Sequence, residues 1–452
     1  MPSEALLEVP RGREQRPNTN ADVPSEKSRF EVNDSDPDLV TFTLSGSYDA
    51  ELPILIDAEN PTRFVSRRIA TQLVDSLTGV FEPSSTNKGQ QDILGHSKAS
   101  TDDIVALMQT SGTTGLPKVA TRTHRAMIHE LDAIAGDDTL KTYNIRRLFC
   151  TPVFHAFSAP EMIFNALRLG RPSYFMRRFD DSFAHNVAQY HITETFGPPP
   201  MLLKLVNQPE NYALLQSLRY VAYGGAPLGL ELRRRFLDLF LIQPRLVPVY
   251  GMTEGGWYAT FHYPEDDDTG SVGRSIPGYD IKINACGADD RTETPTGEIL
   301  VRGPQMMQSY LGNEKATADV FEDGWLKTGD KGYMRDGKLY LIDRIKDLIK
   351  VNCWQVSPTE LQNALLEHDA VAEAAVFAMD EGSVAEHPMV CVVTRSGCVL
   401  SWEEILRHLR ERLAWYKVNY CELRFMKEIP KSATGKIMKR VLRERVLGGG
   451  DW

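Results

Sequence analysis

The sequence is short of the features that mark membrane, secreted and nucleic-acid-binding proteins. None of its apolar runs approaches the ~18 residues of a membrane-spanning helix, and its N-terminus has no apolar core of a secretion signal. Basic residues are in deficit, because 51 Lys and Arg face 61 Asp and Glu for a formal net charge of −10. Nucleic acids and anionic membranes are bound through basic residues, so we expect neither as a partner and predict a cytoplasmic protein.

Cysteine is scarce as well. The six cysteines are scattered along 452 residues and form no C-x-x-C pair. The sequence therefore predicts reduced thiols, and neither a disulfide framework nor a cysteine metal site. The rest of the composition is that of a globular chain, long enough for two or three domains. The exception is residues 1–37, where Pro, Glu, Asp, Asn and Ser dominate and we expect a disordered tail.

Between residues 119 and 260, strand-like and helix-like segments alternate. Each strand-like segment runs into a turn rich in glycine or proline, at 143–154, 171–178, 192–200, 218–227 and 245–254. Helical periodicity occupies the stretches between them, at 185–191, 201–208 and 228–240. Repeats of strand, turn and helix predict an α/β fold with parallel sheets, whose ligand-binding groups lie at the carboxyl ends of the strands.

The second half of the chain has a different texture. From about residue 270 to 342, short strands separated by frequent turns predict an antiparallel sheet or barrel. The residues that follow predict a small α+β unit. In that unit Pro358 stands at the expected start of a helix, and Ser401 with Glu404 forms an S-x-x-E capping box ahead of another.

The segment QTSGTTGLPK, residues 109–118, is the strongest local signal of chemistry. It follows the apolar run 104–108, which predicts a buried strand, and it offers close backbone N–H groups, hydroxyls and a lysine to a polyphosphate. It lacks the Walker A spacing, because Gly115 stands three positions before Lys118 and the residue after the lysine is Val119. A flexible surface loop is the structural alternative, which this combination of residues disfavours.

This loop resembles the signature loop of the adenylate-forming (AMP-binding) superfamily, and further matching segments follow in the family's order across residues 103–440. The wording of DGWLKTGD and LIDRIKDLIK is most similar to acyl-CoA synthetases and aryl-CoA (4-coumarate-CoA-like) ligases. The resemblance implies ATP-dependent activation of a carboxylic acid as an acyl-adenylate with release of pyrophosphate, followed by transfer to CoA. It suggests an aryl or medium-chain acid of specialised metabolism as the substrate.

The resemblance also implies a nucleotide site built from several segments. The residues that it assigns to ATP are Thr110, Ser111, Gly112, Thr113, Thr114, Gly115, Lys118, Gly225, Ala226, Pro227, Tyr250, Gly251, Met252, Thr253, Asp330, Arg344, Lys350 and Lys436. Tyr250 stacks on adenine in this scheme, Thr253 meets the α-phosphate, and Glu254 holds Mg²⁺ as the metal ligand. Asp330 accepts the ribose hydroxyls. Lys436, in PKSATGK, stabilises the reacting oxygens as charge builds.

Two of these segments, taken alone, have an ordinary structural explanation. YGMTE (250–254) matches a strand that ends in a solvated turn, and YGGAP (223–227) matches any tight turn. The resemblance assigns the acid pocket to His155, Phe157, Gly197, Tyr223, Gly224, Gly225 and Gly256. His155 is also a candidate catalytic residue that gates the carboxylate, although a packed, neutral core histidine explains it equally well.

The family likeness predicts the domain organisation. Residues 38–343 form a large N-terminal domain of parallel-rich αβ sheets with a small β-barrel-like subdomain, and residues 344–452 form a small, mobile α+β domain. Asp347 falls at the hinge, about which the small domain rotates between the two half-reactions.

The chain departs from the family pattern in two places. Near residues 80–90 it passes directly to the polar loop ahead of the phosphate motif, so we expect the N-terminal domain to be shortened internally. Cys353 also replaces a turn glycine that faces the pantetheine of CoA, which favours adenylate formation over thioester formation. Two alternatives follow: an enzyme that passes the acyl group to a carrier protein or another acceptor, and a non-catalytic nucleotide-binding remnant.

Overall fold

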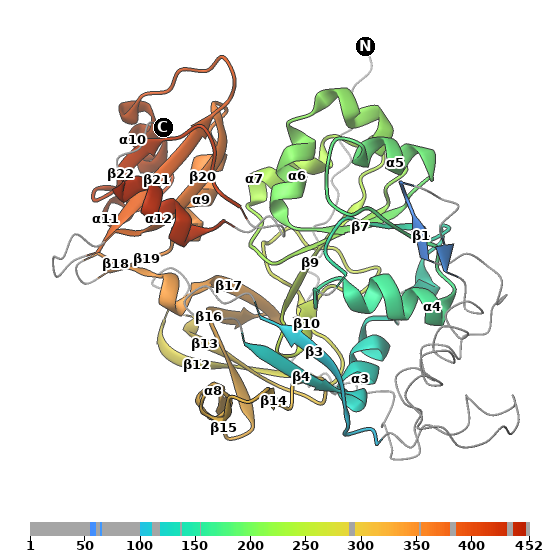
Figure 1. The fold of residues 1–452 in the computed structure, drawn as a ribbon. Coiled ribbons are helices and arrows are strands. Elements are labelled where there is room, and N and C mark those ends of the chain that lie inside the picture. The colour runs from blue at the N-terminus through green and yellow to red at the C-terminus, as the bar shows by residue number, and fades with distance from the viewer. Residues whose placement is uncertain are drawn as a thin grey trace, which may run out of the picture.

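The structure is a computed structural model (Figure 1). The residues that it describes are 55–59, 64–65, 100–110, 118–135, 138–153, 155–288, 294–351, 354–379, 386–431 and 437–448. The predictions for residues 1–37 and for the stretch near 80–90 lie outside these residues. Within them, no helix has both the length and the apolar character that crossing a bilayer requires.

Among the described residues, nine strands form the largest sheet. In spatial order they are β11 (Arg274–Ser275), β10 (Gly256–Thr260), β9 (Arg245–Met252), β8 (Tyr220–Gly224), β7 (Glu194–Gly197), β5 (Arg147–Phe149), β6 (Ser173–Phe175), β1 (Leu55–Asp57) and β2 (Phe64–Val65). From β1 to β9 every neighbouring pair is parallel, and the pairs at both edges are antiparallel. The predicted parallel sheet is confirmed, with shorter strands than the sequence segments suggested.

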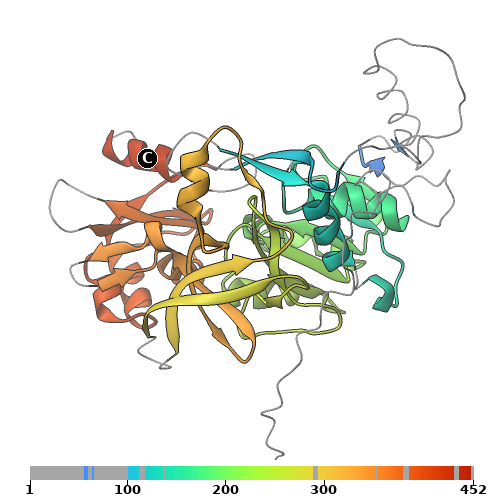
Figure 2. The same cartoon turned by 90° about the horizontal axis from the view of Figure 1, so that it is seen from below.

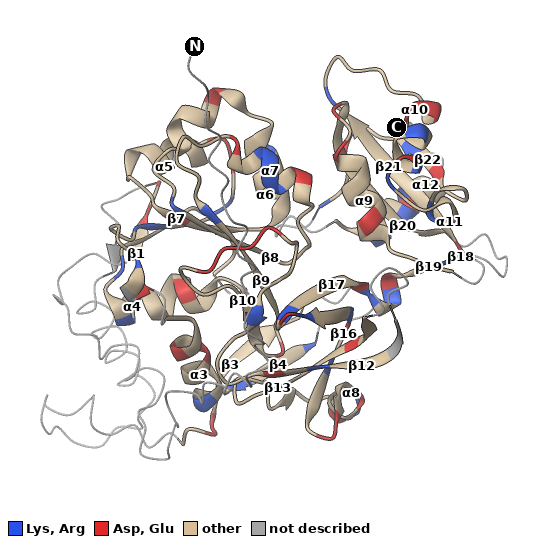
Figure 3. Cartoon of the chain, turned by 180° about the vertical axis from the view of Figure 1, so that it is seen from behind, with Lys and Arg blue, Asp and Glu red and all other residues tan. Residues whose placement is uncertain are grey.

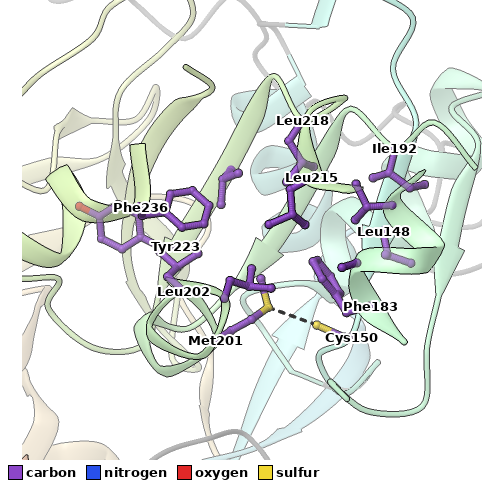
Figure 4. Packing of buried hydrophobic residues seen from close by; sticks show 14 of the residues in the cluster. Leu148, Cys150, Phe183, Ile192, Met201, Leu202, Leu215, Leu218, Tyr223 and Phe236 are labelled. Carbon is purple, nitrogen blue, oxygen red and sulfur yellow. Dashed lines mark hydrogen bonds between the residues drawn. The ribbon is translucent and has the colours of Figure 1, made fainter. Parts of the chain in front are cut away.

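Both faces of this sheet are covered, because successive residues of a strand point to opposite sides. Leu148 and Val221 pack in the cluster of Figure 4, under three helices. The next residue of each strand, Phe149 or Ala222, packs in a second cluster on the other face. The helices of the first face are α5 (Phe183–Gln189), α6 (Pro199–Val206) and α7 (Leu230–Leu237). Each fully buried Leu or Phe stabilises this arrangement by about 1.5–3 kcal/mol.

Other elements complete the large domain. On the second face lie α3 (His124–Ala135) and the π-helix η2 (Pro160–Asn165), which continues into α4 (Ala166–Leu169). The short helices of this domain are η1 (Asp138–Leu140), η3 (Pro209–Leu215) and α8 (Glu314–Val320). Basic and acidic positions are interspersed along helices such as α7, as Figure 3 shows. There Arg234 forms ion pairs with Glu231 and Asp238 at 2.6 and 2.9 Å.

The predicted antiparallel region is also confirmed. Its strands, in spatial order, are β12 (Asp280–Ala288), β13 (Pro295–Arg302), β16 (Trp325–Arg335) and β15 (Phe321–Glu322), with β17 (Lys338–Arg344) also paired to β16. All of these pairs are antiparallel. This sheet packs against the second face of the large sheet, since Ile299 and Leu339 belong to the same buried cluster as Phe149.

A third sheet carries the phosphate motif and corrects one expectation. Its strands are β14 (Ser309–Tyr310), β4 (Val119–Thr123) and β3 (Ile104–Gln109), in that order. The sequence predicted a buried strand at 104–108, but within the described residues β3 is an edge strand, with Ile104 46% and Leu107 59% exposed. An unbroken apolar run is typical of a strand covered on both faces, and here that pattern misled the prediction.

The C-terminal unit is a separate body at one side of the large domain, in orange and red in Figures 1 and 2. After η4 (Ile345–Asp347), its elements are β18 (Ile349–Val351), β19 (Trp354–Val356), α9 (Pro358–Leu366), β20 (Val371–Met379), β21 (His387–Thr394), α10 (Trp402–Arg410), α11 (Trp415–Val418), β22 (Glu422–Phe425) and α12 (Lys439–Leu447). Helices α9 and α10 cover one face of its sheet and α12 covers the other. The helix start at Pro358 and the capping box of Ser401 and Glu404 are both present.

A buried network of charges, which sequence reasoning missed, ties the starts of β5 and β7 to neighbouring helices. Arg147, 2% exposed, forms ion pairs with Asp138 at 2.7 Å, Glu161 at 2.8 Å and Glu194 at 2.9 Å. Lys141 Nζ bridges two of these carboxylates, at 2.9 Å from Asp138 and 2.8 Å from Glu194. Burial raises the pKa of the Glu161 carboxyl above its ordinary value. The guanidinium is therefore the principal cation that compensates three buried acids.

Replacing Arg147 by Met is expected to lower the free energy of unfolding of the large domain by about 3–5 kcal/mol, because it leaves the buried carboxylates short of a cation. Urea denaturation measures the change. The control is Arg234→Ala, which removes exposed ion pairs on α7 and is expected to change stability by less than ~1 kcal/mol. Equal losses in the two variants would show that the network does not stabilise this sheet.

Candidate active site

A buried carboxylate joins three of the predicted nucleotide segments. Asp330 lies in the middle of β16, opposite Arg344 at the end of β17. Tyr250 of β9 donates its hydroxyl to Asp330 Oδ2 at 2.9 Å, and Arg344 Nε lies 3.3 Å from Oδ1. Burial and the nearby carboxylate raise the pKa of Tyr250 well above its ordinary value, so this tyrosine stays a hydrogen-bond donor. The hydroxyl and the guanidinium therefore fix the orientation of the Asp330 carboxylate.

A second carboxylate, Glu254, lies at the other end of the YGMTE segment. Its side chain is buried and accepts a hydrogen bond from the Tyr310 hydroxyl at 2.6 Å. Lys118 Nζ lies over the ring of the same tyrosine, 4.0 Å from its centroid. The carboxylate predicted to hold the metal and the lysine predicted to hold phosphate are thus in contact with one side chain. Tyr310 was missed in the sequence, where SYLGN carries no recognisable signal.

The phosphate motif closes a hairpin between β3 and β4. Thr110 N–H donates to the carbonyl oxygen of Lys118 at 2.8 Å, and Lys118 N–H donates to Thr110 Oγ1 at 3.2 Å. A Walker A loop leads from a strand into a helix, whereas this loop leads from strand to antiparallel strand. The predicted site residues between these ends lie outside the described residues, namely Ser111, Gly112, Thr113, Thr114 and Gly115. Lys436 and Cys353 lie outside them as well.

The turn between β9 and β10 carries Thr253, Glu254 and Gly255, and its backbone is held from several sides. Met307 N–H donates to the Glu254 carbonyl oxygen at 2.7 Å. The Tyr279 hydroxyl donates to the Gly255 carbonyl oxygen at 2.7 Å. Gly251 is needed for close strand approach, because a Cβ there would overlap the carbonyl oxygen of Gly256. Met252, the last residue of β9, and Thr253, the first residue of the turn, are half-buried.

The YGGAP segment ends β8 in an exposed turn. Gly225, Ala226 and Pro227 are all exposed, and Gly225 adopts a φ of +80°, which favours glycine. Among the described residues, no heavy atom other than those of Gly225 and its chain neighbours lies within 4 Å of the place where a Cβ at Gly225 would stand, so open space faces this backbone. The turn is therefore accessible to a flat ligand.

Phe157, Gly224 and Gly256, three of the seven predicted acid-pocket residues, lie at one place beside β8 and β10. A Cβ at Gly224 would stand 3.1 Å from the Phe157 ring, so this glycine lets the ring approach β8. Trp257, next to Gly256, stacks on Phe157 with ring centroids 6.0 Å apart and donates its indole N–H to the Phe157 carbonyl oxygen at 3.1 Å. The chain thus places an aromatic wall beside the nucleotide segments.

Three predicted residues have different surroundings. Tyr223 packs in the cluster of Figure 4, on the opposite face of the sheet from Phe157. A Cβ at Gly197 would contact the Met201 sulfur at 2.5 Å, also on that side. His155 is half-buried, and its Nδ1 accepts the N–H of Phe157 at 3.2 Å, a local bond that fixes its own loop.

The predicted hinge region forms contacts within the C-terminal unit. Asp347 ends η4, and its Oδ2 accepts a hydrogen bond from Lys439 of α12 at 2.9 Å. Lys350 is exposed on β18, with its N–H donating to Glu386 at 2.8 Å. Its side chain is therefore available to a ligand rather than committed to the core.

The chain matches two consecutive family models. The AMP-binding enzyme family matches residues 18–311, beginning inside the segment predicted as a tail, and the AMP-binding enzyme C-terminal domain matches residues 360–436. The acyl-CoA ligase M9 of Phoma sp. is 36% identical over 91% of this chain and 97% of the relative. That alignment runs over 531 positions, more than the 452 residues of this chain, so part of the relative faces gaps.

Two further comparisons also match proteins named as CoA ligases or synthetases. The acyl-CoA ligase clz12 of Cochliobolus lunatus is 44% identical over 73% of this chain and 97% of that one. The structure of o-succinylbenzoate CoA synthetase from Bacillus subtilis, in complex with its acyl-adenylate intermediate, superposes with a TM-score of 0.64 at 29% identity. It covers 76% of this chain and 70% of that chain. With a large α/β domain of mixed sheets and a smaller C-terminal domain, this chain belongs to the AMP-binding enzyme family.

Proposed function

We propose that this chain is an AMP-forming acid–thiol ligase that activates an aryl or medium-chain carboxylic acid with ATP and transfers the acyl group to CoA. Membership of the family supports acid adenylation and thioester formation as its activity. The observation that carries the proposal is the buried Asp330, held by Tyr250 and Arg344, because it joins three separate nucleotide segments in one place. The specific acid class and the residue roles are our proposals.

The chemistry has two steps. In the first, a carboxylate oxygen of the acid attacks the α-phosphorus of ATP, the bond to the bridging oxygen breaks, and pyrophosphate leaves with the electron pair. In the second, the CoA sulfur attacks the acyl carbon, the thiol proton passes to solvent, and AMP leaves. Both steps crowd negative charge, which fixed cations and N–H donors offset. We assign this task to Lys118 and the phosphate hairpin, and to Lys436 at the reacting oxygens.

The residues around Glu254 fit a magnesium ion that arrives with ATP. Mg²⁺ prefers oxygen ligands and is usually held by one or two carboxylates together with substrate phosphates. Glu254 supplies one buried carboxylate, and no group of three or more His, Cys, Asp or Glu able to hold a metal occurs among the described residues. When bound, Mg²⁺ would neutralise charge on the phosphates. Tyr310 would keep the Glu254 carboxylate in one orientation through its hydrogen bond.

The domain organisation supports two half-reactions at one site. We propose residues 38–343 and 344–452 as the two domains, with Asp347 as the hinge, since the C-terminal unit has hydrophobic clusters of its own. We also propose that an internal segment is missing near residues 80–90, which the gapped alignment with the Phoma ligase supports. Cys353, in place of the family's turn glycine, makes a carrier-protein thiol or another acceptor the second candidate.

The central test is pyrophosphate release over a panel of benzoic, 4-coumaric, phenylacetic, hexanoic and octanoic acids, with and without CoA. We expect ATP-dependent release with at least one acid, and formation of its CoA thioester, identified by mass spectrometry, when CoA is present. Release without any thioester would replace CoA by another acceptor. A folded chain that releases no pyrophosphate, yet is stabilised by ATP and Mg²⁺ in a thermal shift, would identify a nucleotide-binding remnant.

Lys436→Ala is expected to slow adenylate formation by about 10²–10³-fold, the loss typical when one charge-stabilising donor is removed from a transition state. The affinity for ATP should change little, because the lysine acts on the reacting oxygens. Single-turnover kinetics and calorimetry measure the two quantities. Lys431→Ala is the control, since Lys431 belongs to the same PKSATGK segment but pairs with Glu373 at 2.7 Å. Equal loss of binding and chemistry would contradict the role assigned to Lys436.

Tyr310→Phe is expected to weaken ATP binding in the presence of Mg²⁺ by about tenfold, because a hydrogen bond to a charged group contributes roughly 1.5–3 kcal/mol. The ring that contacts Lys118 is retained in this variant, so the loss reports on the hydroxyl and Glu254 alone. Isothermal titration calorimetry gives the affinity. Tyr420→Phe, at a 44% exposed tyrosine of the small domain, is the control. An unchanged affinity in Tyr310→Phe would remove Tyr310 from the site.

A further inference from the structure

Arg122 and Glu130 form a buried ion pair next to the start of β10, close to the turn that carries Glu254. Neither residue has a role in the proposed reaction. Arg122 of β4 is fully buried and Glu130 of α3 is 1% exposed. Arg122 Nη2 donates to Glu130 Oε2 at 2.9 Å. Burying two charged groups costs hydration free energy, and a hydrophobic pair of the same size does not incur this cost. A contribution to stability alone therefore does not explain why an ion pair occupies this position.

The other oxygen of Glu130 contacts the backbone of the β9–β10 hairpin. Oε1 accepts the N–H of Trp257 at 3.3 Å. The residue before it, Gly256, has a φ of +74°, and a Cβ there would overlap the Glu130 carboxylate. Only glycine allows both this backbone conformation and this approach. The carboxylate therefore sits where it fixes the first residues of β10.

The contact between Glu130 and Trp257 connects the ion pair to the proposed acid pocket. The β9–β10 pairing shifts register between Trp257 and Ala259, so the backbone at Trp257 is irregular and depends on contacts from outside the ladder. Trp257 in turn stacks on Phe157 and donates its indole N–H to that residue's carbonyl oxygen. An unbroken chain of contacts thus runs from Glu130 through Trp257 to Phe157.

Arg122 supports Glu130 and little else. Its Nε and Nη1 atoms are buried and have no hydrogen-bond partner in the described part of the chain. Burial raises the pKa of Glu130, and the guanidinium opposes that rise. Arg122 lies on β4, four residues after Lys118, which directly precedes this strand. The strand that begins at the phosphate hairpin therefore also carries the cation that keeps Glu130 in place.

We infer that Glu130, held by Arg122, is a positioning residue for the acid-binding wall: it sets the backbone at Gly256 and Trp257, and through Trp257 the place of Phe157. The inference rests on the proposed function for its effect on the acid, and on geometry alone for its effect on the hairpin. Nothing in it requires Glu130 to touch a substrate.

Hydrogen–deuterium exchange and steady-state kinetics test the inference together. Glu130→Ala is expected to speed amide exchange in residues 252–258 by about tenfold, because one backbone N–H loses its buried acceptor. It is also expected to raise KM for the acid with the highest wild-type rate in the panel by about tenfold, with less than about a twofold change in KM for ATP. Glu130→Gln, which keeps an acceptor oxygen, should restore most of both.

Asp138→Asn is the matched control. Asp138 is also a buried carboxylate paired with an arginine, at 2.7 Å from Arg147, but it lies in the network at the start of β5. It is expected to lower stability without changing exchange in residues 252–258 or the ratio of the two KM values. If Glu130→Ala does not fold, Glu130→Asp replaces it in the experiment. The shorter aspartate keeps a negative charge near Arg122 but moves the carboxylate oxygen away from the Trp257 N–H.

Two results would overturn the inference. One is equal exchange in residues 252–258 for the Glu130 variants and Asp138→Asn. The other is a parallel rise in KM for acid and ATP, which would make Glu130 a general stabilising residue. If the wild-type chain turns over no acid of the panel, the proposed function fails, and the exchange comparison still decides whether Glu130 positions the hairpin.

Discussion

The hydrogen bond from Tyr250 to Asp330 joins the large parallel sheet to the antiparallel sheet at the predicted nucleotide site. Tyr250 ends a strand of the parallel sheet and Asp330 lies in the antiparallel one, 80 residues away. Because both groups are buried, each would lose its hydrogen-bond partner, at a cost in free energy, if the other moved away. The bond therefore holds Tyr250 of the YGMTE segment beside Asp330 and, through Asp330, beside Arg344. The contacts that we propose to the adenine and the ribose depend on this arrangement.

Charge is buried in this protein in two different settings. The Arg147 network lies at the start of the parallel strands, away from the carboxyl ends where ligands bind in such sheets, and it holds strands and helices of the scaffold together. At the β9–β10 hairpin, each buried polar group forms a hydrogen bond with a residue from another element. These pairs are Glu254 with Tyr310, Gly255 with Tyr279, and Trp257 with Glu130. Buried polar contacts of this kind give a turn one geometry, which apolar packing alone does not specify.

The features that could be predicted from the sequence are those determined by residues close together in the chain. Strand, turn and helix alternate between residues 119 and 260, and the parallel sheet follows from that pattern alone. The capping box at Ser401 and the helix start at Pro358 depend on neighbours within four residues, and both were predictable. The burial of β3 was predicted wrongly, because an apolar run does not reveal whether another element covers the strand, and Leu107 is exposed.

The rest of the site could not be read from the chain, because its contacts join residues with no pattern between them. Tyr310 reaches Glu254 across 56 positions and Glu130 reaches Trp257 across 127. A tyrosine in SYLGN or a glutamate inside an amphipathic helix is ordinary in sequence, and only the fold brings each of them to the β9–β10 hairpin. Motifs therefore identify the groups that we propose to contact the ligand, whereas the fold determines which groups hold those motifs in place. The acid-binding role that we propose for Phe157 and Trp257 depends on both sets, since an aromatic wall selects a ligand only if its backbone is fixed.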